Sequence, residues 1–395
     1  MNPQHFALVT DGIWRKSLSV IRSLGKAGYR VGILGNSAFT VGFWSRYSSR
    51  KIYATPAEKN SEKFGKKLLK VLESNPGTVL FPMEDATIQW VSRNRDAVAR
   101  SGAQLLLPPD SSLEIALDRG LTLETAEKLG IPCPTTWTPR NAEAFARKSL
   151  EFKKNEFIVK PRSGMSQLGI TFGDSRKMSS WDQLKDHWKS YGPLLIQEKI
   201  PAEGLGMGVS ALISQDGNCV ASFVYLRLKE YPFGGGVSTD RKSIIDPTLT
   251  EMSLALLKAL SWQGIAMIEW KEDPRDGKPK LMRIIPRFWG SLELAIRAGI
   301  DFPKLYGAVA RGEDCSRGAL LYQEGIRCRW MIPGEFLRYR STPKGRRESL
   351  WQFLKGLPSI AEEWDWTDKK GTIAAWACGW ISMLSPWRRK HLKRS

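Results

Sequence analysis

The chain has 395 residues, enough for two or three domains, and 42% apolar with 25% charged residues is the composition of a folded globular protein, not a disordered one. Sixty Lys and Arg against 40 Asp and Glu give a formal net charge of +20, which favours anionic partners without choosing among them. Five scattered cysteines with no CxxC pair argue against a disulfide framework and a structural zinc site.

The first residues, MNPQHFALVTDG, lack the basic segment and the long apolar stretch of a secretion signal. No apolar run reaches the 18 residues that a transmembrane helix needs. We therefore expect a cytoplasmic protein.

The first 110 residues alternate between apolar strands and amphipathic helices. The pattern predicts strands at 6–9, 29–34, 78–82 and 104–107, and helices at 15–27 and through 88–98. This alternation predicts an open parallel sheet. Asp11, Glu84 and Asp85 directly follow strands, at the edge where such sheets bind ligands. Glu84 and Asp85 either face a substrate or cap the following helix.

From residue 111 the pattern changes. Two short helical pieces precede a break at Pro132 and Pro134, and a helix is expected at 254–260. Strands are expected at 156–160 and 194–199, and as two antiparallel hairpins that pair 209–213 with 220–228 and 264–270 with 280–285. These segments predict α+β lobes.

Four blocks of this region carry chemistry. Lys160 ends a strand before a Gly/Ser-rich loop, 162–169. A lysine and free backbone N–H groups suit a phosphate, and the alternative is a solvated lysine beside a hairpin loop, which this signal alone favours. Glu198 lies among apolar residues and is either part of a site or a salt-bridged structural residue. Glu269 lies in an apolar strand, and the next strand ends with Arg283 and Arg287.

The order of these blocks resembles the ATP-grasp superfamily, especially the branch of the carbamoyl-phosphate synthetase large subunit and biotin carboxylase. The resemblance covers about residues 1–314 and is most specific over 264–303. It implies an α/β and α+β fold: an N-terminal open parallel-sheet (pre-ATP-grasp) domain at 1–110, a two-lobed ATP-grasp domain at 111–314, and a C-terminal extension at 315–395.

The resemblance implies an ADP-forming ligation that uses ATP and Mg²⁺. A carboxylate attacks the γ-phosphate to give an acylphosphate, and an amine or similar nucleophile then displaces phosphate. The second substrate is expected to be an anionic small molecule or polymer.

The resemblance also assigns roles to individual residues. Lys160 is expected to bind phosphate and Glu269 to be the first magnesium ligand, while Arg287 stabilises the developing charge. The remaining expected site residues are Arg119, Ser163, Gly164, Gln197, Glu198, Lys199 and Ile200 around ATP, and Arg241 and Lys242 near the substrate.

The sequence departs from the family at its magnesium motif. The family has Glu-x-Asn-Pro-Arg in the last strand, where the Glu and the Asn bind magnesium; here those two positions are Arg283 and Ile285. Arg283 could instead grip a phosphate. The alternative function is therefore a catalytically impaired nucleotide-binding protein with a regulatory, scaffolding or membrane-surface role.

The C-terminal end is apolar and then basic. Residues 372–384 are almost wholly apolar but too short to span a bilayer, and residues 387–395 read WRRKHLKRS. This segment is either a core-packing helix with a basic tail or a peripheral anchor on an anionic membrane surface. No motif supports nucleic-acid binding.

Overall fold

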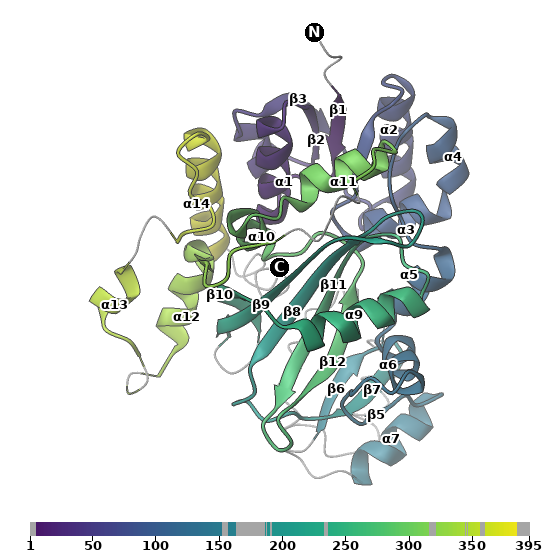
Figure 1. Cartoon of the computed structure of the whole chain (residues 1–395), viewed down its shortest axis with the longest axis vertical. Coiled ribbons are helices and arrows are strands. Elements are labelled where there is room, and N and C mark those ends of the chain that lie inside the picture. The colour runs from purple at the N-terminus through teal and green to yellow at the C-terminus, as the bar shows by residue number, and fades with distance from the viewer. Residues whose placement is uncertain are drawn as a thin grey trace.

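The computed structural model describes residues 5–151, 157–162, 186, 188–189, 192–232, 236–315, 321–343, 345, 347–355 and 360–384. Three sheets form its framework: a parallel sheet near the N-terminus, a large antiparallel sheet in the middle and a small antiparallel sheet at the far end (Figure 1). The α/β and α+β fold expected from the sequence is confirmed.

The N-terminal domain is a four-stranded parallel sheet in the order β3-β2-β1-β4. Its elements are β1 (Phe6–Val9), α1 (Arg15–Lys26), β2 (Arg30–Gly35), η1 (Val41–Trp44), β3 (Ser48–Tyr53), α2 (Ser61–Glu73), β4 (Val79–Phe81), α3 (Asp85–Arg93) and α4 (Arg95–Arg100). Because β1 lies between β2 and β4, its carboxyl end opens at the middle of the sheet edge, beside the start of α1.

Three details of this domain differ from the sequence prediction. The single helix expected through 88–98 is two helices, α3 and α4, which meet at Asn94. Residues 104–107 form no strand; Gln104 alone bridges to Val79. Strand β3 was not predicted, because it is an edge strand whose Ser, Arg and Lys side chains leave it without an apolar pattern.

The small sheet, in the order β5-β7-β6, forms the first lobe of the second domain. Two helices lead into it from the parallel sheet, and one covers it. The elements are α5 (Asp110–Leu117), α6 (Arg119–Lys128), β5 (Thr136–Trp137), α7 (Ala142–Glu151), β6 (Phe157–Pro161) and β7 (Leu194–Glu198). Both strands predicted here are confirmed.

The large sheet has the order β12-β11-β8-β9-β10-β13, and both predicted hairpins lie in it. Its strands and covering helix are β8 (Gly206–Ile213), β9 (Cys219–Tyr231), β10 (Val237–Ile244), α9 (Pro247–Ala259), β11 (Gly264–Asp273), β12 (Lys278–Ile285) and β13 (Arg327–Arg329). One face packs on α9 through Ala266, Ile268 and Trp270. The other carries Met267 and Ile285 into a core shared with the parallel sheet.

Helices α10 (Leu292–Ala298) and α11 (Phe302–Ala310) join the large sheet to the N-terminal domain. Tyr306 on α11 is buried, and its hydroxyl accepts a hydrogen bond from the backbone N–H of Leu106 at 3.0 Å. Trp289 and Phe302 fill the same core. Because this core is continuous, the two domains hold the residues at their junction in a fixed arrangement.

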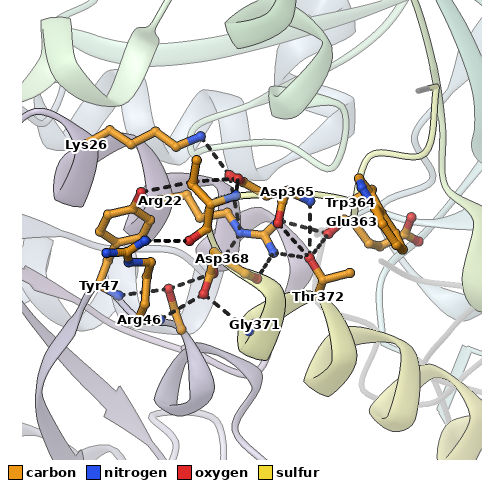
Figure 2. Close-up of polar contacts among 12 residues, drawn as sticks. Arg22, Lys26, Arg46, Tyr47, Glu363, Trp364, Asp365, Asp368, Gly371 and Thr372 are labelled. Carbon is orange, nitrogen blue, oxygen red and sulfur yellow. Dashed lines mark hydrogen bonds and ion pairs between the residues drawn. The ribbon is translucent and has the colours of Figure 1, made fainter. Parts of the chain in front are cut away.

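The C-terminal extension turns back onto both domains. Its elements are β13, η3 (Met331–Glu335), α12 (Phe336–Ser341), α13 (Leu350–Leu354) and α14 (Lys369–Leu384). Figure 2 shows its contact with the N-terminal domain: Asp368, fully buried, accepts hydrogen bonds from Arg22 Nε at 2.9 Å, Ser45 Oγ at 2.8 Å and the backbone N–H of Arg46 at 2.8 Å.

Helix α14 is apolar on two sides. Gly371, Thr372, Ala375, Gly379 and Met383 are buried, and Ala375 packs against Leu18 and Val41 of the N-terminal domain. Ile373, Ala377, Trp380 and Ile381 are exposed on the other side. The core-packing helix predicted from the sequence is therefore present on one face. In the part of the chain that the structure describes, no helix is long and apolar enough to cross a bilayer.

Candidate functional site

Lys160 lies on β6 and is held by a side chain of the neighbouring strand. Ile158 pairs with Gln197, so Lys160 is the diagonal neighbour of Gln197 on the same sheet face. Lys160 Nζ donates to Gln197 Oε1 at 2.6 Å, and Gln197 Nε2 donates to Thr136 Oγ1 at 3.0 Å. Burial and the neighbouring Arg119 lower the pKa of Lys160 to about 7. This ammonium group gains strongly from a bound anion.

Asp118 and Arg119 attach the start of α6 to the end of β6. Asp118 caps the helix by accepting from Leu121 N–H at 3.0 Å, and it forms an ion pair with Arg162 at 2.8 Å. Arg119 Nη1 donates to the carbonyl oxygen of Pro161 at 2.9 Å. Burial and the charge of Arg283 lower the pKa of Arg119 to about 10. Arg119 is also close enough to Lys160 to lower the pKa of that lysine.

Glu269 and Arg283 face each other across the β11–β12 ladder. Arg283 donates from Nε to Glu269 Oε2 at 2.6 Å and from Nη2 to Oε1 at 3.1 Å, a bidentate ion pair. Although burial opposes it, the guanidinium lowers the pKa of Glu269 to about 2. The carboxylate is ionised at neutral pH with both oxygens engaged.

The N-terminal domain contributes acids to the same region. Asp85, at the start of α3, accepts from Arg287 Nε at 2.7 Å, and Glu84 pairs with Lys16 of α1 at 2.6 Å. Glu84 occupies the N-cap position of α3, as the capping alternative expected, but its side chain makes no capping hydrogen bond. Asp11 lies next to this group with a left-handed backbone, φ 50°. Burial and Glu84 raise the pKa of Asp11 to about 6.

Several of these side chains line one pocket. Asp85, Arg119, Arg283, Ile285 and Arg287 line it, together with Ala116, Leu117, Ile284 and Pro286. Lys160 is close enough for its pKa to be lowered by Arg119 and Arg283. The pocket therefore lies between helix α3 of the N-terminal domain, helices α5 and α6, and the end of β12 in the large sheet.

The side chains at this pocket do not fit a magnesium site. Magnesium needs near-octahedral oxygen ligands, but both Glu269 oxygens are held by Arg283. Ile285 offers no oxygen and is 7% exposed, packed in the shared core. Among the described residues no group of three His, Cys, Asp or Glu could hold a metal ion. The family's metal motif is therefore replaced by an internal ion pair.

The expected adenine hinge, 197–200, consists of the last two residues of β7 and the two residues after it. Glu198 accepts from Thr135 N–H at 3.0 Å and lies 3.3 Å from Arg275, which matches the salt-bridged structural alternative. Lys199 is exposed and Ile200 is buried. The adenine-binding role of this segment stays a prediction.

The two expected substrate residues do not join the pocket. Arg241 is fully buried and donates from Nη1 to Glu362 of the C-terminal extension at 2.5 Å, while Lys242 is exposed on the opposite face of β10. A substrate would reach Arg241 only if this buried ion pair opened, so its role stays a prediction. Ser163 and Gly164 lie outside the described residues.

Lys16 was not expected at the site, and Arg162 was expected there only as the first residue of the loop 162–169. Lys16 is buried in the first turn of α1, directly after the turn that follows β1. Its position at the carboxyl edge of a parallel sheet was the available signal. Arg162 follows Lys160 by two residues, but its partner Asp118 is 44 residues away in sequence, which no local pattern reveals.

The overall fold resembles several solved structures. No family model matches the sequence, and no curated protein matches it. N5-carboxyaminoimidazole synthetase from Staphylococcus aureus aligns with a TM-score of 0.62 and 13% identity over 84% of this chain and 83% of that one.

Two further structures match in the same way. A biotin carboxylase β-γ-ATP complex from Campylobacter jejuni has a TM-score of 0.59 and 15% identity over 78% of this chain and 71% of that chain. L-amino acid ligase from Bacillus licheniformis has a TM-score of 0.58 and 14% identity over 78% of this chain and 75% of that one. At these identities the likeness concerns architecture, and together with the two-lobed site it establishes that this chain has the ATP-grasp fold.

Proposed function

We propose that this chain is a ligase-like ATP-grasp protein that binds ATP between the small lobe and the large sheet. The observation that carries the proposal is that Arg119 and Arg283 line one pocket, with Lys160 near enough to be repelled by both. Burial and this repulsion lower the pKa of Lys160 and of Arg119. Buried cations that repel one another are stabilised by a polyphosphate, whose charges they neutralise.

The reaction class is the ADP-forming joining of a carboxylate to an amine or similar nucleophile. The carboxylate oxygen attacks the γ-phosphorus, ADP leaves, and the nucleophile then displaces inorganic phosphate from the acylphosphate. Lys160 would neutralise the phosphates, and Arg287, held by Asp85 at 2.7 Å, would stabilise charge that develops on the transferring group. The bound carboxylate would lie on the side of the N-terminal domain, where Lys16 and Arg287 supply positive charge.

A second function uses the same pocket without turnover. The ion pair between Glu269 and Arg283 favours it, because the metal that neutralises charge during phosphoryl transfer lacks its ligands. In that case the chain binds nucleotide and acts by regulation or scaffolding.

Two measurements test these proposals. ATP at 100 times its Kd should stabilise the fold by about 2.7 kcal/mol and raise the melting temperature, and Lys160→Ala should remove most of that rise. Lys278→Met, an exposed residue at the far end of β12, is the matched control and should keep the ATP response. If millimolar ATP leaves the wild-type melting temperature unchanged, nucleotide binding is wrong.

ADP release against a panel of carboxylates and amines separates ligase from binding protein. Turnover at an ordinary enzyme rate, on the order of 1–10 per second, would establish the ligase and rule out the second function. ATP binding without ADP release under every condition would establish the nucleotide-binding function and rule out the ligase.

A further inference from the structure

The β11–β12 ladder places a cation where the family places a metal ligand. Glu269 and Arg283 are directly opposite residues of paired strands, so the backbone alone brings their side chains together. The resulting bidentate pair is preformed, and its side chains line or border the pocket. We infer that this site binds its nucleotide as the metal-free polyphosphate, with Arg283 supplying the positive charge that a divalent cation would otherwise bring. The inference rests on the proposed nucleotide site.

The donors of Arg283 are sufficient for both partners. A guanidinium has five N–H donors, and the two contacts to Glu269 use those on Nε and one on Nη2. The side chain remains 38% exposed, toward the pocket that it lines with Arg119 and Arg287. Three N–H donors therefore remain outside the pair with Glu269, and phosphate oxygens are acceptors that a planar guanidinium can bind bidentately.

Binding a metal instead would require several unfavourable changes. Glu269 would have to leave Arg283, and the guanidinium would then face the incoming dication at short range. The next family position, Ile285, packs with Phe288 and Met267 and offers no ligand atom. A nucleotide that arrives with its metal thus meets one carboxylate, already neutralised, and an excess of positive charge.

The surrounding cations lead to the same conclusion. Burial and like charges lower the pKa of Lys160 to about 7 and of Arg119 to about 10, and in both residues Arg283 is one of the neighbours responsible. Such a site gains more from a polyphosphate that keeps its full negative charge than from one partly neutralised by magnesium. Magnesium should therefore leave the nucleotide affinity unchanged or weaken it.

The test is a titration of the full-length protein with ATP by calorimetry, in excess EDTA and in excess Mg²⁺. The inference predicts that Kd in EDTA is equal to or lower than Kd in Mg²⁺. Binding that is at least tenfold tighter with Mg²⁺ would overturn this inference but leave the proposed nucleotide site standing. No binding under either condition would overturn the nucleotide site itself, so the two failures are distinguishable.

The variant Arg283→Met tests whether Arg283 is the residue that allows ATP to bind without a metal. The variant removes the cation and frees both oxygens of Glu269, so ATP affinity in EDTA should fall at least tenfold and Mg²⁺ should now improve binding. Lys278→Met removes a charge from the same strand at the hairpin end and should change neither value. An Arg283→Met protein with wild-type affinity in EDTA would contradict the role of Arg283. If that variant does not fold, the Kd of ATP for the wild-type protein in EDTA and in Mg²⁺ still tests the inference.

Discussion

Two groups of ion pairs in this molecule use the same residue types in different surroundings. At the contact between the C-terminal extension and the N-terminal domain, Arg22 and Asp368 have side chains that are 4% and 0% exposed, and several neutral donors complete the coordination of the carboxylate (Figure 2). At the pocket, Arg283 and Glu269 are 38% and 18% exposed, and burial and like charges lower the pKa of the neighbouring cations.

This difference in burial and in neighbouring charge distinguishes ion pairs that stabilise the fold from the cations that we propose bind a nucleotide. In the first group each oxygen of Asp368 has a donor, so the charges satisfy one another. In the second, Lys160 is bonded to a neutral amide and lies among arginines. Substitutions in the first group should affect stability, and substitutions in the second should affect binding.

Asp368→Ala should have the largest effect. It removes the carboxylate bonded to buried Arg22 at 2.9 Å and leaves the more distant Asp365 at 3.9 Å, at a cost of about 3–5 kcal/mol in the free energy of unfolding. Asp110→Ala breaks an exposed pair with Arg95 and should cost less than about 1 kcal/mol. Urea unfolding of both variants measures the two losses in the free energy of unfolding. Equal losses would mean that burial does not determine how much an ion pair contributes to stability.

The sequence predicted the candidate site residues that belong to single strands. It did not predict the contacts between residues that are far apart in the sequence. Lys160, Glu269 and Arg283 lie in apolar strands and Arg287 follows one by two residues, so a local pattern shows them. The hairpins were predictable because Asp216-Gly217 and Asp276-Gly277 mark their turns.

The C-terminal extension was not predictable in this way. Asp368 meets Arg22 across 346 residues, and Glu362 meets Arg241 across 121. Strand β13 has only three residues, and two of them are arginines, so nothing in its sequence indicates a strand. Such contacts depend on tertiary packing, which no local sequence pattern shows.

The second prediction concerns the pH dependence of ATP binding. The pKa of Lys160 is about 7 in the free site, and bound phosphates would raise it, because they stabilise the ammonium form. Below pH 7 the lysine is charged before ATP arrives, whereas above pH 7 binding must take up a proton. Affinity should therefore fall by up to about tenfold per pH unit above pH 7.

Calorimetry at pH 8 in two buffers of different ionisation enthalpy measures that proton uptake. Lys278→Met should show the same uptake, and Lys160→Met should show less. Equal uptake by wild type and Lys160→Met would place the titrating group elsewhere.

The third prediction concerns the pH dependence of stability at the buried contact. Burial and the adjacent Glu362 raise the pKa of Glu363 to about 8, although the backbone N–H of Ile332 donates to it at 3.2 Å. The folded state then holds a proton that the unfolded state releases near pH 4.5, so this group's contribution to stability falls as pH rises between about 4.5 and 8.

Glu363→Gln has a neutral side chain at every pH. It should therefore reduce the loss of stability as pH rises between about 4.5 and 8. Unfolding free energies at pH 5.5 and 8.5 test it, with Glu251→Gln on the exposed side of α9 as the control. An unchanged pH profile in Glu363→Gln would contradict the assignment.

The smallest expected effect concerns the exposed face of α14, which belongs to neither group of ion pairs. Ile373, Ala377, Trp380 and Ile381 recur at three- and four-residue spacing, and exposed Lys369 and Lys370 precede them. A helix apolar on both faces needs a second partner, and the sequence that follows, WRRKHLKRS, carries positive charge. The membrane-surface role predicted from the sequence would use this face against anionic lipid.

Co-sedimentation with anionic vesicles at low salt should therefore recover part of the full-length protein, and neutral vesicles should not. Because both charge and apolar contact contribute, 0.5 M salt and the pair of changes Ile373→Ser with Ile381→Ser should each reduce the bound fraction. Trp351→Ser, which alters an exposed tryptophan on α13 instead, should leave it unchanged. If the double variant binds as wild type does, the apolar face of α14 is not a lipid contact. If wild type ignores anionic vesicles at low salt, α14 serves only to pack the extension onto the N-terminal domain.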